Sequence, residues 1–589
     1  MRDMSAKVTL SLLVGFALAG CGDDDHPITP DGPPTPDAGA DGAGNPDAPP
    51  GAAGTLDVTR YTLAITLDPA QGSYAAQAIL DVSVTAAGAS FALDLAADVV
   101  VDQVGGLAAG HARQGDVLTL TAAGTVPIGP AQATVMYHGD MNQLARFTPD
   151  TCPTAFGGLM ITTNSHGDTI IDSYNWPFLA RRWIPSHDHP SDGAALDLSV
   201  TIDAAYTVVA NGTLAGTVDN AGGTRTWHWI ESHDMPVYDV HIAAFPYVEH
   251  DLGTAAGGIP VKVYLYPEDA AFAAPVGEAV GAIGWLGAQL APYAWEKYFL
   301  VEAPICGGAM EEATVVTMDE TTLADPTYSR NTTVHELVHH WIGNAVRIAS
   351  WNDFWISEGF AENLTGLYLL ATYGAAVHDQ YMSDAWQNAH DWEAPAYDHP
   401  VRPPDPEVNV YDIFDGLSYD KANWLLHSLR EHIGDAAFWQ GVRGFYAAHA
   451  FAAAGTDELQ AAFEAASAQD LDWFFDQFVR TAFHPQLAGS FSFDAGTGTA
   501  TVTIDQVQQR GLARYQIPVD VELLGAAAGQ SVRQTVTLTA DPQVIAVTPG
   551  FTPTRLVLDP DEKLYIDVKC LAPGDCPAGR TCGGGFCRR

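Results

Sequence analysis

Apolar and polar residues alternate along most of residues 55–252, and this pattern predicts β-strands. The segments "TRYTLAITLD", "AILDVSVTA" and "YTVVANGTLAGTV" carry apolar residues at alternating positions and are rich in β-branched side chains. Gly, Asn and Asp separate such segments, as is typical of turns. We therefore expect an all-β domain over 55–252.

A helical period replaces this alternation over residues 253–486. Apolar residues recur at three- and four-residue intervals in "GEAVGAIGWLGAQLAPYAWEKY", which predicts a helix over 277–298. The same spacing predicts further helices that begin near Ser329, Asn352, Tyr419, Asp435, Asp457 and Leu471. Residues 253–486 are therefore expected to form a mainly helical domain.

Alternation returns over residues 487–569, in segments such as "TATVTIDQV" and "VRQTVTLTA", and it predicts a C-terminal β-sandwich. The fold class expected for the whole chain is multidomain α+β, because a β domain, a helical domain and a second β domain follow in series. Residues 570–589 form a separate tail rich in Cys and Gly.

The N-terminus has the pattern of an export signal followed by a tether. Arg2 and Lys7 precede an apolar run too short to cross a membrane, and this run ends in "LAGC" at Cys21. The ending resembles a bacterial lipobox, so 1–20 are expected to be a lipoprotein signal peptide and Cys21 to be lipidated; a plain signal peptide is the alternative. Pro, Asp, Ala and Gly dominate 21–54, which predicts a disordered tether. We expect an exported bacterial lipoprotein, tethered to the cell envelope and touching a membrane only through Cys21.

The formal net charge of the chain is −45, although only 16% of its 589 residues are charged. Nucleic-acid binding requires a basic surface, so this charge argues against a nucleic-acid partner. The sequence does not indicate the oligomeric state.

Seven cysteines are present, and lipidation of Cys21 leaves an even number. Four of them crowd the C-terminal tail without a C-x2-C pair, which favours two disulfides over a zinc site and leaves the connectivity open. These four are Cys570, Cys576, Cys582 and Cys587. By elimination, Cys152 and Cys306 are expected to pair with each other.

Helical spacing in "HELVHHW", residues 335–341, selects two of its three histidines for a metal. A helix advances 100° per residue, so His335 and His339 share a face, while His340 lies about 140° from His335. With Glu336 beside them, this is the H-E-x-x-H geometry of a zinc hydrolase. Zinc needs a third protein ligand, and Glu358, eighteen residues beyond His339, is the candidate.

These residues carry a resemblance to a known family. "HELVHHWIGNAVRIASWNDFWISEGFAE" resembles the zinc signature of the aminopeptidase N family of zinc metallopeptidases, which are gluzincins. "GGAMEE" (307–312) resembles its G-A-M-E-N substrate-binding strand, and "LSYDKANWLLHSLREHIGDAAFW" (417–439) resembles the helix that bears its catalytic tyrosine. The likeness covers roughly 57–568, and the long C-terminal helical domain of many relatives has no counterpart in the chain.

The resemblance implies a saddle-like N-terminal β domain, a thermolysin-like catalytic domain and one Zn²⁺ per chain. His335, His339 and Glu358 would hold the metal, and Glu336 would act as the general base. Tyr419 would donate a hydrogen bond to the oxyanion. For Glu362, one helical turn after Glu358, two interpretations stay open: it orients a ligand histidine, or it is a solvated carboxylate.

The resemblance also assigns a substrate-binding strand, formed by Gly308, Ala309, Met310, Glu311 and Glu312. In it, Glu311 would pair with the free α-ammonium of a peptide. The family has Asn where this chain has Glu312, so either both carboxylates attract the ammonium or one has a raised pKa and stays protonated. The family's Gln-x-Glu is also missing.

Tyr174 and Trp176 stand where the family has that Gln-x-Glu, and we hypothesise that Glu312 substitutes for the missing carboxylate. The function expected is a zinc aminopeptidase that hydrolyses N-terminal residues from peptides with a free N-terminus. Two alternatives are an endopeptidase with an open cleft and a non-catalytic peptide-binding surface lipoprotein.

Overall fold

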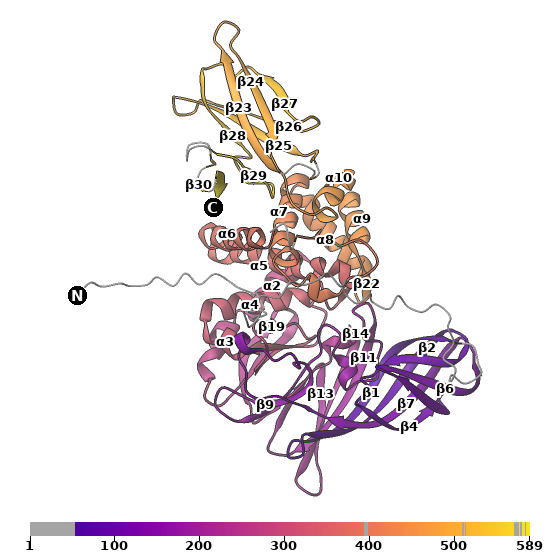
Figure 1. Cartoon of the computed structure of the whole chain (residues 1–589). Coiled ribbons are helices and arrows are strands. Elements are labelled where there is room, and N and C mark those ends of the chain that lie inside the picture. Colours follow the sequence, from indigo (N-terminus) through magenta and orange to yellow (C-terminus); the bar gives the residue numbers. More distant parts are fainter. Residues whose placement is uncertain are drawn as a thin grey trace, which may run out of the picture.

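The computed structural model describes residues 53–393, 398–508, 512, 514–570, 576–577, 580–583 and 585–588. A β-rich N-terminal region, a helical middle region and a group of C-terminal strands follow one another along the molecule (Figure 1). The chain is therefore multidomain, as predicted. The expected signal peptide, Cys21 and nearly all of the expected tether lie outside the described residues.

The N-terminal region is built on a long sheet whose strands alternate between buried and exposed positions. In β1 (Thr55–Asp68), for example, Leu63 and Ile65 are buried while Ala64 and Thr66 are exposed, which is the alternation seen in the sequence. The strand order is β13 (Thr213–Asp219), β14 (Thr224–Pro236), β11 (Gly193–Asp203), β1, β2 (Ser73–Ala86), β7 (Gly129–Asp140) and β4 (Val100–Gly106).

Two smaller sheets complete the N-terminal region. One has the order β3 (Gly88–Asp94), β6 (Val117–Val126) and β5 (Gly110–Gln114). The other has the order β12 (Thr207–Ala210), β15 (Ile242–Phe245), β10 (Thr169–Tyr174), β9 (Gly158–Thr163) and β8 (Asn142–Gln143).

The helical region contains a mixed sheet that the sequence pattern did not predict. Its order is β16 (Val248–Ala255), β17 (Ile259–Leu265), β18 (Tyr298–Ala303), β20 (Val315–Asp319) and β19 (Ala309–Met310). Every residue of β18 and β20 is buried, so both faces are covered and no alternation marks these strands in the sequence. The expected domain boundary at 252/253 falls within β16, which pairs with β17.

The helices of this region agree with the predicted period, with two differences. The helices are α1 (Ala273–Val276), α2 (Ala279–Gln289), α3 (Glu320–Ala324), α4 (Pro326–His339), α5 (Phe354–Tyr373), α6 (Ala375–Trp392), α7 (Ala422–Ile433), α8 (Asp435–His449), α9 (Thr456–Ser467) and α10 (Asp472–Phe474). The helix predicted over 277–298 ends at Gln289, shortly before Pro292, which cannot continue a helix. The helices α1, α3 and α6 were not predicted.

By length and composition alone, Ala270–Gln289 is apolar enough to cross a membrane. Within it, α2 buries Ala282, Ile283 and Leu286 in the core, as a core helix of a globular protein does. The stretch is therefore weak evidence for a membrane span.

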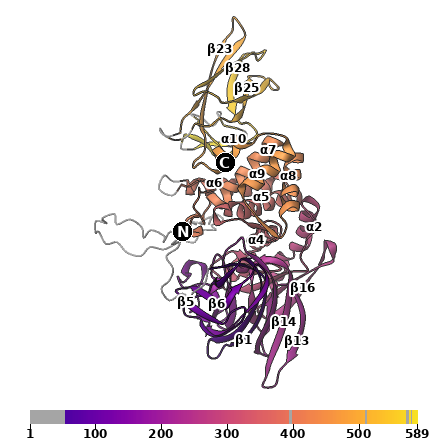
Figure 2. The same cartoon turned by 90° about the vertical axis from the view of Figure 1, so that its right-hand side faces the viewer.

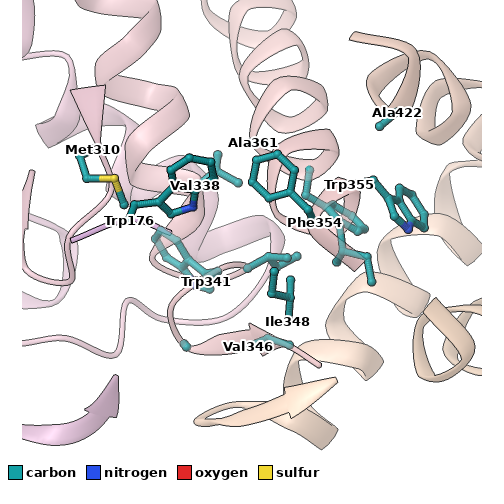
Figure 3. Close-up of a cluster of buried hydrophobic side chains, with 14 of the residues drawn as sticks. Trp176, Met310, Val338, Trp341, Val346, Ile348, Phe354, Trp355, Ala361 and Ala422 are labelled. Atoms are coloured by element: carbon teal, nitrogen blue, oxygen red, sulfur yellow. The ribbon is translucent and has the colours of Figure 1, made fainter. Parts of the chain in front are cut away.

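A dense apolar cluster joins α4 and α5. Figure 3 shows Val338 and Trp341 near Phe354, Trp355 and Ala361, together with Trp176 from the N-terminal region. All of these side chains are buried. Because interiors are packed to near-crystalline density, this cluster fixes the distance and rotation between the two helices that carry the candidate metal ligands.

The C-terminal strands form two sheets in the described part of the chain. One has the order β27 (Gln543–Val547), β24 (Thr499–Gln506), β23 (Gln486–Asp494) and β29 (Asp567–Val568). The other has the order β26 (Ser531–Thr537), β25 (Pro518–Gly525) and β28 (Pro553–Leu558). Two short pairs remain, β21 (Val346–Ile348) with β22 (Ala452–Ala454), and β30 (Thr581–Gly583) with β31 (Phe586–Arg588).

Three disulfides are present among the described cysteines. Cys152 pairs with Cys306, which confirms the pairing expected by elimination. The tail pairs Cys570 with Cys582 and Cys576 with Cys587, so the structure supplies the connectivity that the sequence left open. The first of these bonds holds Cys306, the residue directly before Gly307, where the predicted substrate-binding segment begins.

Glu302 on β18 is expected to make the stability of the protein depend on pH. Its side chain is buried, one carboxylate oxygen accepts a hydrogen bond from the Tyr266 amide at 2.8 Å, and burial and Asp269 raise its pKa to about 9. Between pH 4.5 and 9 the unfolded carboxyl is ionised while the folded one keeps its proton, so stability falls as pH rises.

Glu302→Gln does not titrate and keeps the acceptor for Tyr266. We expect its melting temperature, relative to wild type, to rise steadily from pH 5 to pH 8, by the equivalent of about 1–3 kcal/mol. Calorimetric melts at several pH values measure this difference. The exposed Glu268→Gln serves as the control, and a difference for Glu302→Gln that does not change with pH would contradict the assignment.

Candidate active site

Helix α4 presents the H-E-x-x-H residues at its C-terminal end. Asp325 caps its N-terminus by accepting hydrogen bonds from the amides of Thr327 and Tyr328, each at 2.9 Å, and Pro326 occupies the first helical position. His335 and His339 lie one turn apart, and their ring centroids are 4.9 Å from each other. The local sequence thus specifies both the helix and the common face of the two histidines.

Helix α5 brings Glu358 to the same point from a separate part of the chain. Glu358 Oε2 lies 3.2 Å from His335 Nε2 and 3.4 Å from His339 Nε2. All three side chains are largely buried. Although burial opposes ionisation, contact with His339 and His335 lowers the pKa of Glu358 to about 2. The structure therefore brings the three predicted ligands together.

The outer nitrogen of each histidine contacts an oxygen on α5. His335 Nδ1 lies 3.1 Å from Glu362 Oε1, and His339 Nδ1 lies 2.9 Å from Ser357 Oγ. Such contacts orient metal-binding imidazoles and leave Nε2 directed at the metal. For Glu362, this geometry favours the first of the two interpretations left open by the sequence. Ser357 was not singled out from the sequence.

This donor set fits Zn²⁺. Ligands held about 2.0–2.1 Å from a tetrahedral zinc ion stand about 3.3 Å apart, and the two Nε2-to-Oε2 separations are 3.2 and 3.4 Å. Two imidazoles and one carboxylate are also the ligands of a catalytic zinc site that keeps a fourth position open.

His340 belongs to the core, as helical spacing predicted when it excluded this residue from the metal face. Helix α4 ends at His339, and the His340 ring lies against Tyr293, whose hydroxyl is 2.6 Å from Nδ1. Burial, followed by the charge of His339, lowers the pKa of His340 to about 3. Its imidazole is therefore neutral and structural.

A cavity with about 690 Å³ of empty space, which includes part of the open solvent at its mouth, surrounds the predicted ligands. Its wall includes His335, Glu336, His339, Glu358 and the predicted Glu311 and Tyr419. Several further residues of the wall were not identified from the sequence. These are Gly307, Tyr328, Asn331, Thr332, Tyr381 and Phe414. Tyr328, Asn331 and Thr332 lie on α4 seven, four and three residues before His335, so the helical period could have placed them on the metal face. Gly307, Tyr381 and Phe414 come from other segments, in which no local pattern indicates the cavity.

Glu336 lines this cavity beside the two histidines. It shares a cluster with Glu311 and His339 in which one potential ligand atom from each residue lies within 4.8 Å of the others. Burial raises the pKa of Glu336 to about 8, against the lowering effect of the neighbouring histidines.

Tyr419 lies in a π-helical segment, η8 (Leu417–Lys421), that leads into α7. Its ring is stacked on that of His335, with centroids 6.3 Å apart. Burial, reinforced by the charges of Glu358 and Glu311, raises the pKa of Tyr419 well above its usual range. The phenol therefore keeps its proton and can donate a hydrogen bond. Single π-helical turns are often found at functional sites.

Backbone alternation divides the predicted substrate-binding strand between two faces. Gly308, Ala309 and Glu311 line the cavity, whereas Met310 points into the apolar cluster that Figure 3 shows. Successive side chains of an extended strand point to opposite faces. Glu312 is therefore also directed away from the cavity, and the expectation that all five residues face the substrate is corrected for Met310 and Glu312.

Glu312 contacts the N-terminal β region. Its Oε1 lies 3.3 Å from His241 Nδ1, and its Oε2 accepts a hydrogen bond from the Thr317 amide at 3.1 Å. Burial raises the pKa of the Glu312 carboxyl well above its usual range, which matches the second outcome considered from the sequence. Glu312 is not among the residues that line the cavity, which argues against the hypothesis that it substitutes for the missing Gln-x-Glu.

Hydrogen bonds from other parts of the chain hold this segment in place. Asn344 Nδ2 donates to the Glu311 carbonyl at 2.6 Å, and Asn211 Nδ2 donates to the Ala313 carbonyl at 2.7 Å.

Of the two residues that stand in place of Gln-x-Glu, Tyr174 lines the cavity. Trp176 is buried, with its ring centroid 4.8 Å from that of Phe414. Only one of the two residues that replace Gln-x-Glu therefore reaches the site.

Comparison with known proteins agrees with this geometry. The Peptidase family M1 domain matches residues 279–478, and the Peptidase M1 N-terminal domain matches residues 112–238. Aminopeptidase M1-D of Oryza sativa subsp. japonica is 27% identical over 456 residues, which cover 72% of this chain and 50% of that protein. Human aminopeptidase N is 28% identical over 299 residues, 46% of this chain and 30% of that protein.

Human endoplasmic reticulum aminopeptidase 1 is 25% identical over 372 residues, 59% of this chain and 38% of that protein. The chain spans about half the length, or less, of the curated relatives it matches.

The site is that of a metallopeptidase, which is a hydrolase. It combines an H-E-x-x-H helix with a glutamate on the next helix, in a cavity that holds a second buried carboxylate. The chain belongs to peptidase family M1, among the relatives of aminopeptidase N.

Proposed function

We propose that this protein is a zinc-dependent aminopeptidase that removes N-terminal residues from peptides. The observation that carries the proposal is the position of Glu311, a buried carboxylate in the same cavity as the three proposed zinc ligands and Glu336. A buried carboxylate with an oxygen within 4.8 Å of potential ligand atoms of Glu336 and His339 suits the α-ammonium of a peptide whose first peptide bond lies at the metal. The relatives named above are all aminopeptidases.

His335, His339 and Glu358 would hold one Zn²⁺ per chain. The ion supplies Lewis acidity, which polarises the scissile carbonyl and lowers the pKa of a water molecule. Glu336 would accept the proton of the attacking water and deliver it to the leaving amine. Tyr419 would donate its phenolic hydrogen to the oxyanion, and Glu311 would hold the α-ammonium. Glu362 and Ser357 would keep the two imidazoles in orientation.

Paired peptides with a free and an acetylated N-terminus test this function directly. We expect the purified protein to release the first residue of the free peptide only, to lose this activity on dialysis against a chelator, and to regain it when Zn²⁺ is added back. Mass spectrometry of the products identifies the cleaved bond. Equal cleavage of both peptides would favour the endopeptidase, and bound zinc without any cleavage would favour the non-catalytic binding protein.

We also propose a catalytic domain that begins with β16 at Val248, instead of at 253 as expected from the sequence, and ends at 486, followed by a β-sandwich over 487–569. The contact between Gly489 of β23 and Leu556 of β28 supports face-to-face packing, because a Cβ at Gly489 would stand 2.9 Å from the Leu556 side chain. For 1–54 we propose a lipoprotein signal and tether, supported by the LAGC sequence and composition alone. Incorporation of radiolabelled palmitate that is lost in Cys21→Ser tests this.

A further inference from the structure

Two histidines and an aspartate meet where the helical region contacts the C-terminal strands. His390 lies near the end of α6, His484 lies just before β23, and Asp567 lies on β29. Figure 1 shows α6 close to β29. Their side chains are 12%, 6% and 1% exposed, and none of them lines the catalytic cavity. The proposed mechanism gives these residues no role.

The hydrogen bonding of His390 leaves one ring nitrogen directed at a carboxylate. Its Nδ1 lies 2.8 Å from the Trp386 carbonyl oxygen, which can only accept, so Nδ1 carries the hydrogen of the neutral ring. Its Nε2, buried and without a hydrogen-bond partner among the described residues, lies 3.3 Å from Asp567 Oδ1. A nitrogen lone pair that faces a carboxylate oxygen is repulsive unless a cation lies between them.

His484 repeats this arrangement on the other side of Asp567. Its Nδ1 contacts Glu393 Oε2, and its buried Nε2 lies 3.4 Å from Asp567 Oδ2. Glu393 is itself held by Lys421, whose Nζ is 2.5 Å from Oε1. Although burial opposes protonation, contact with Glu393 and Asp567 raises the pKa of His484 to about 9, so a metal bound at Nε2 would replace a proton there while Nδ1–H stays donated to Glu393. Each oxygen of the aspartate thus faces one imidazole nitrogen.

We propose that His390, His484 and Asp567 bind a second divalent transition-metal cation of the Zn²⁺ type, separate from the catalytic one. The Nε2-to-carboxylate separations of 3.3 and 3.4 Å fit ligands around a tetrahedral zinc ion, which stand about 3.3 Å apart. Glu393 orients His484 through Nδ1, as Glu362 does for His335 in the candidate active site. Two imidazoles and one carboxylate favour zinc over calcium or magnesium.

The charged groups around the cluster include more carboxylates than cationic side chains, which favours a divalent cation. Three carboxylates surround it, those of Glu393, Asp567 and Asp398, and both Asp398 oxygens are buried without a hydrogen-bond partner among the described residues. Lys421 forms an ion pair with Glu393, and the nearby Arg580 is paired with Glu562. With both imidazoles neutral, as metal ligands are, three negative charges and one positive charge leave a net negative charge that one divalent cation offsets.

The proposed ion would cross-link three separate segments of the chain. Its ligands come from α6, from the segment that leaves the helical region, and from the last strand of the C-terminal sheet. A metal that binds the folded but not the unfolded arrangement stabilises the folded protein. Its expected role is therefore structural, at the joint between the helical region and the C-terminal strands.

Metal content measured by inductively coupled plasma mass spectrometry tests the proposal. After equilibration with Zn²⁺ and removal of the excess, we expect about two equivalents in the wild type, one in His335→Ala, one in His390→Ala and none in the double variant. His228→Ala is the matched control, because His228 pairs with Asp197 at 2.8 Å outside this cluster. One equivalent in the wild type, lost entirely in His335→Ala, would overturn the proposal.

A second measurement covers the case in which a variant is destabilised. In metal-free His335→Ala protein, Zn²⁺ is expected to raise the melting temperature, and this rise should be lost in His335→Ala/Asp567→Asn. Co²⁺ is expected to quench tryptophan fluorescence in the same background, since the Trp386 ring lies 4.4 Å from that of His390. If neither ion has an effect in His335→Ala, His484 is a protonated bridge between Glu393 and Asp567, and the second site does not exist.

Discussion

Glu336→Gln is expected to lower kcat by about 10²- to 10⁴-fold while the protein keeps its zinc. Glutamine fills the same volume beside His335 and His339 but has no basic oxygen to take the proton of the attacking water. The neighbouring imidazoles and Glu358 are unchanged, so metal binding should be preserved. Steady-state kinetics on a free-amine peptide, together with metal analysis, measure both effects.

The control for this variant is Glu431→Gln, which makes the same chemical change on the exposed surface of α7. It should leave kcat and metal content at wild-type values. If Glu336→Gln also loses its zinc, the residue acts on the metal site itself. If it keeps both its zinc and its full turnover, another group is the general base.

Glu311→Gln is expected to reduce kcat/KM for free-amine peptides by about 30- to 1,000-fold, the cost of about 2–4 kcal/mol for losing one partner of a buried charge pair. Cleavage of the free-amine peptide should fall much more than cleavage of the acetylated peptide, because the proposed zinc ligands and Glu336 are intact. We therefore expect the ratio of free to acetylated peptide cleavage to collapse. Competition between the two peptides in one reaction measures this ratio.

The neighbouring Glu312→Gln is the informative control. Its carboxyl faces His241 and Thr317 instead of the cavity, and glutamine keeps the acceptor for the Thr317 amide. The selectivity ratio should therefore stay at the wild-type value. A collapse of selectivity in Glu312→Gln, with none in Glu311→Gln, would restore the hypothesis drawn from the sequence, that Glu312 serves the amine site.

The sequence by itself determined the metal-binding face of α4. His335 and His339 share a face, and His340 does not, because the angle between residues of one helix depends only on their spacing. The need for a third ligand suggested Glu358, and the family resemblance supported it and added Tyr419 and the predicted substrate-binding segment. Alternation and helical period likewise indicated the β-rich N-terminal region and most helices of the middle region, since these elements have one buried and one exposed face.

The tertiary structure alone decided which carboxylates share a cavity. Glu311 and Glu312 are adjacent and chemically identical, yet the path of the backbone turns one toward the proposed zinc ligands and the other toward His241. The buried sheet around β18 and β20 carried no alternation, because both of its faces are covered. His390, His484 and Asp567 meet only because α6 packs beside the C-terminal strands, and no local spacing encodes a contact between such distant segments.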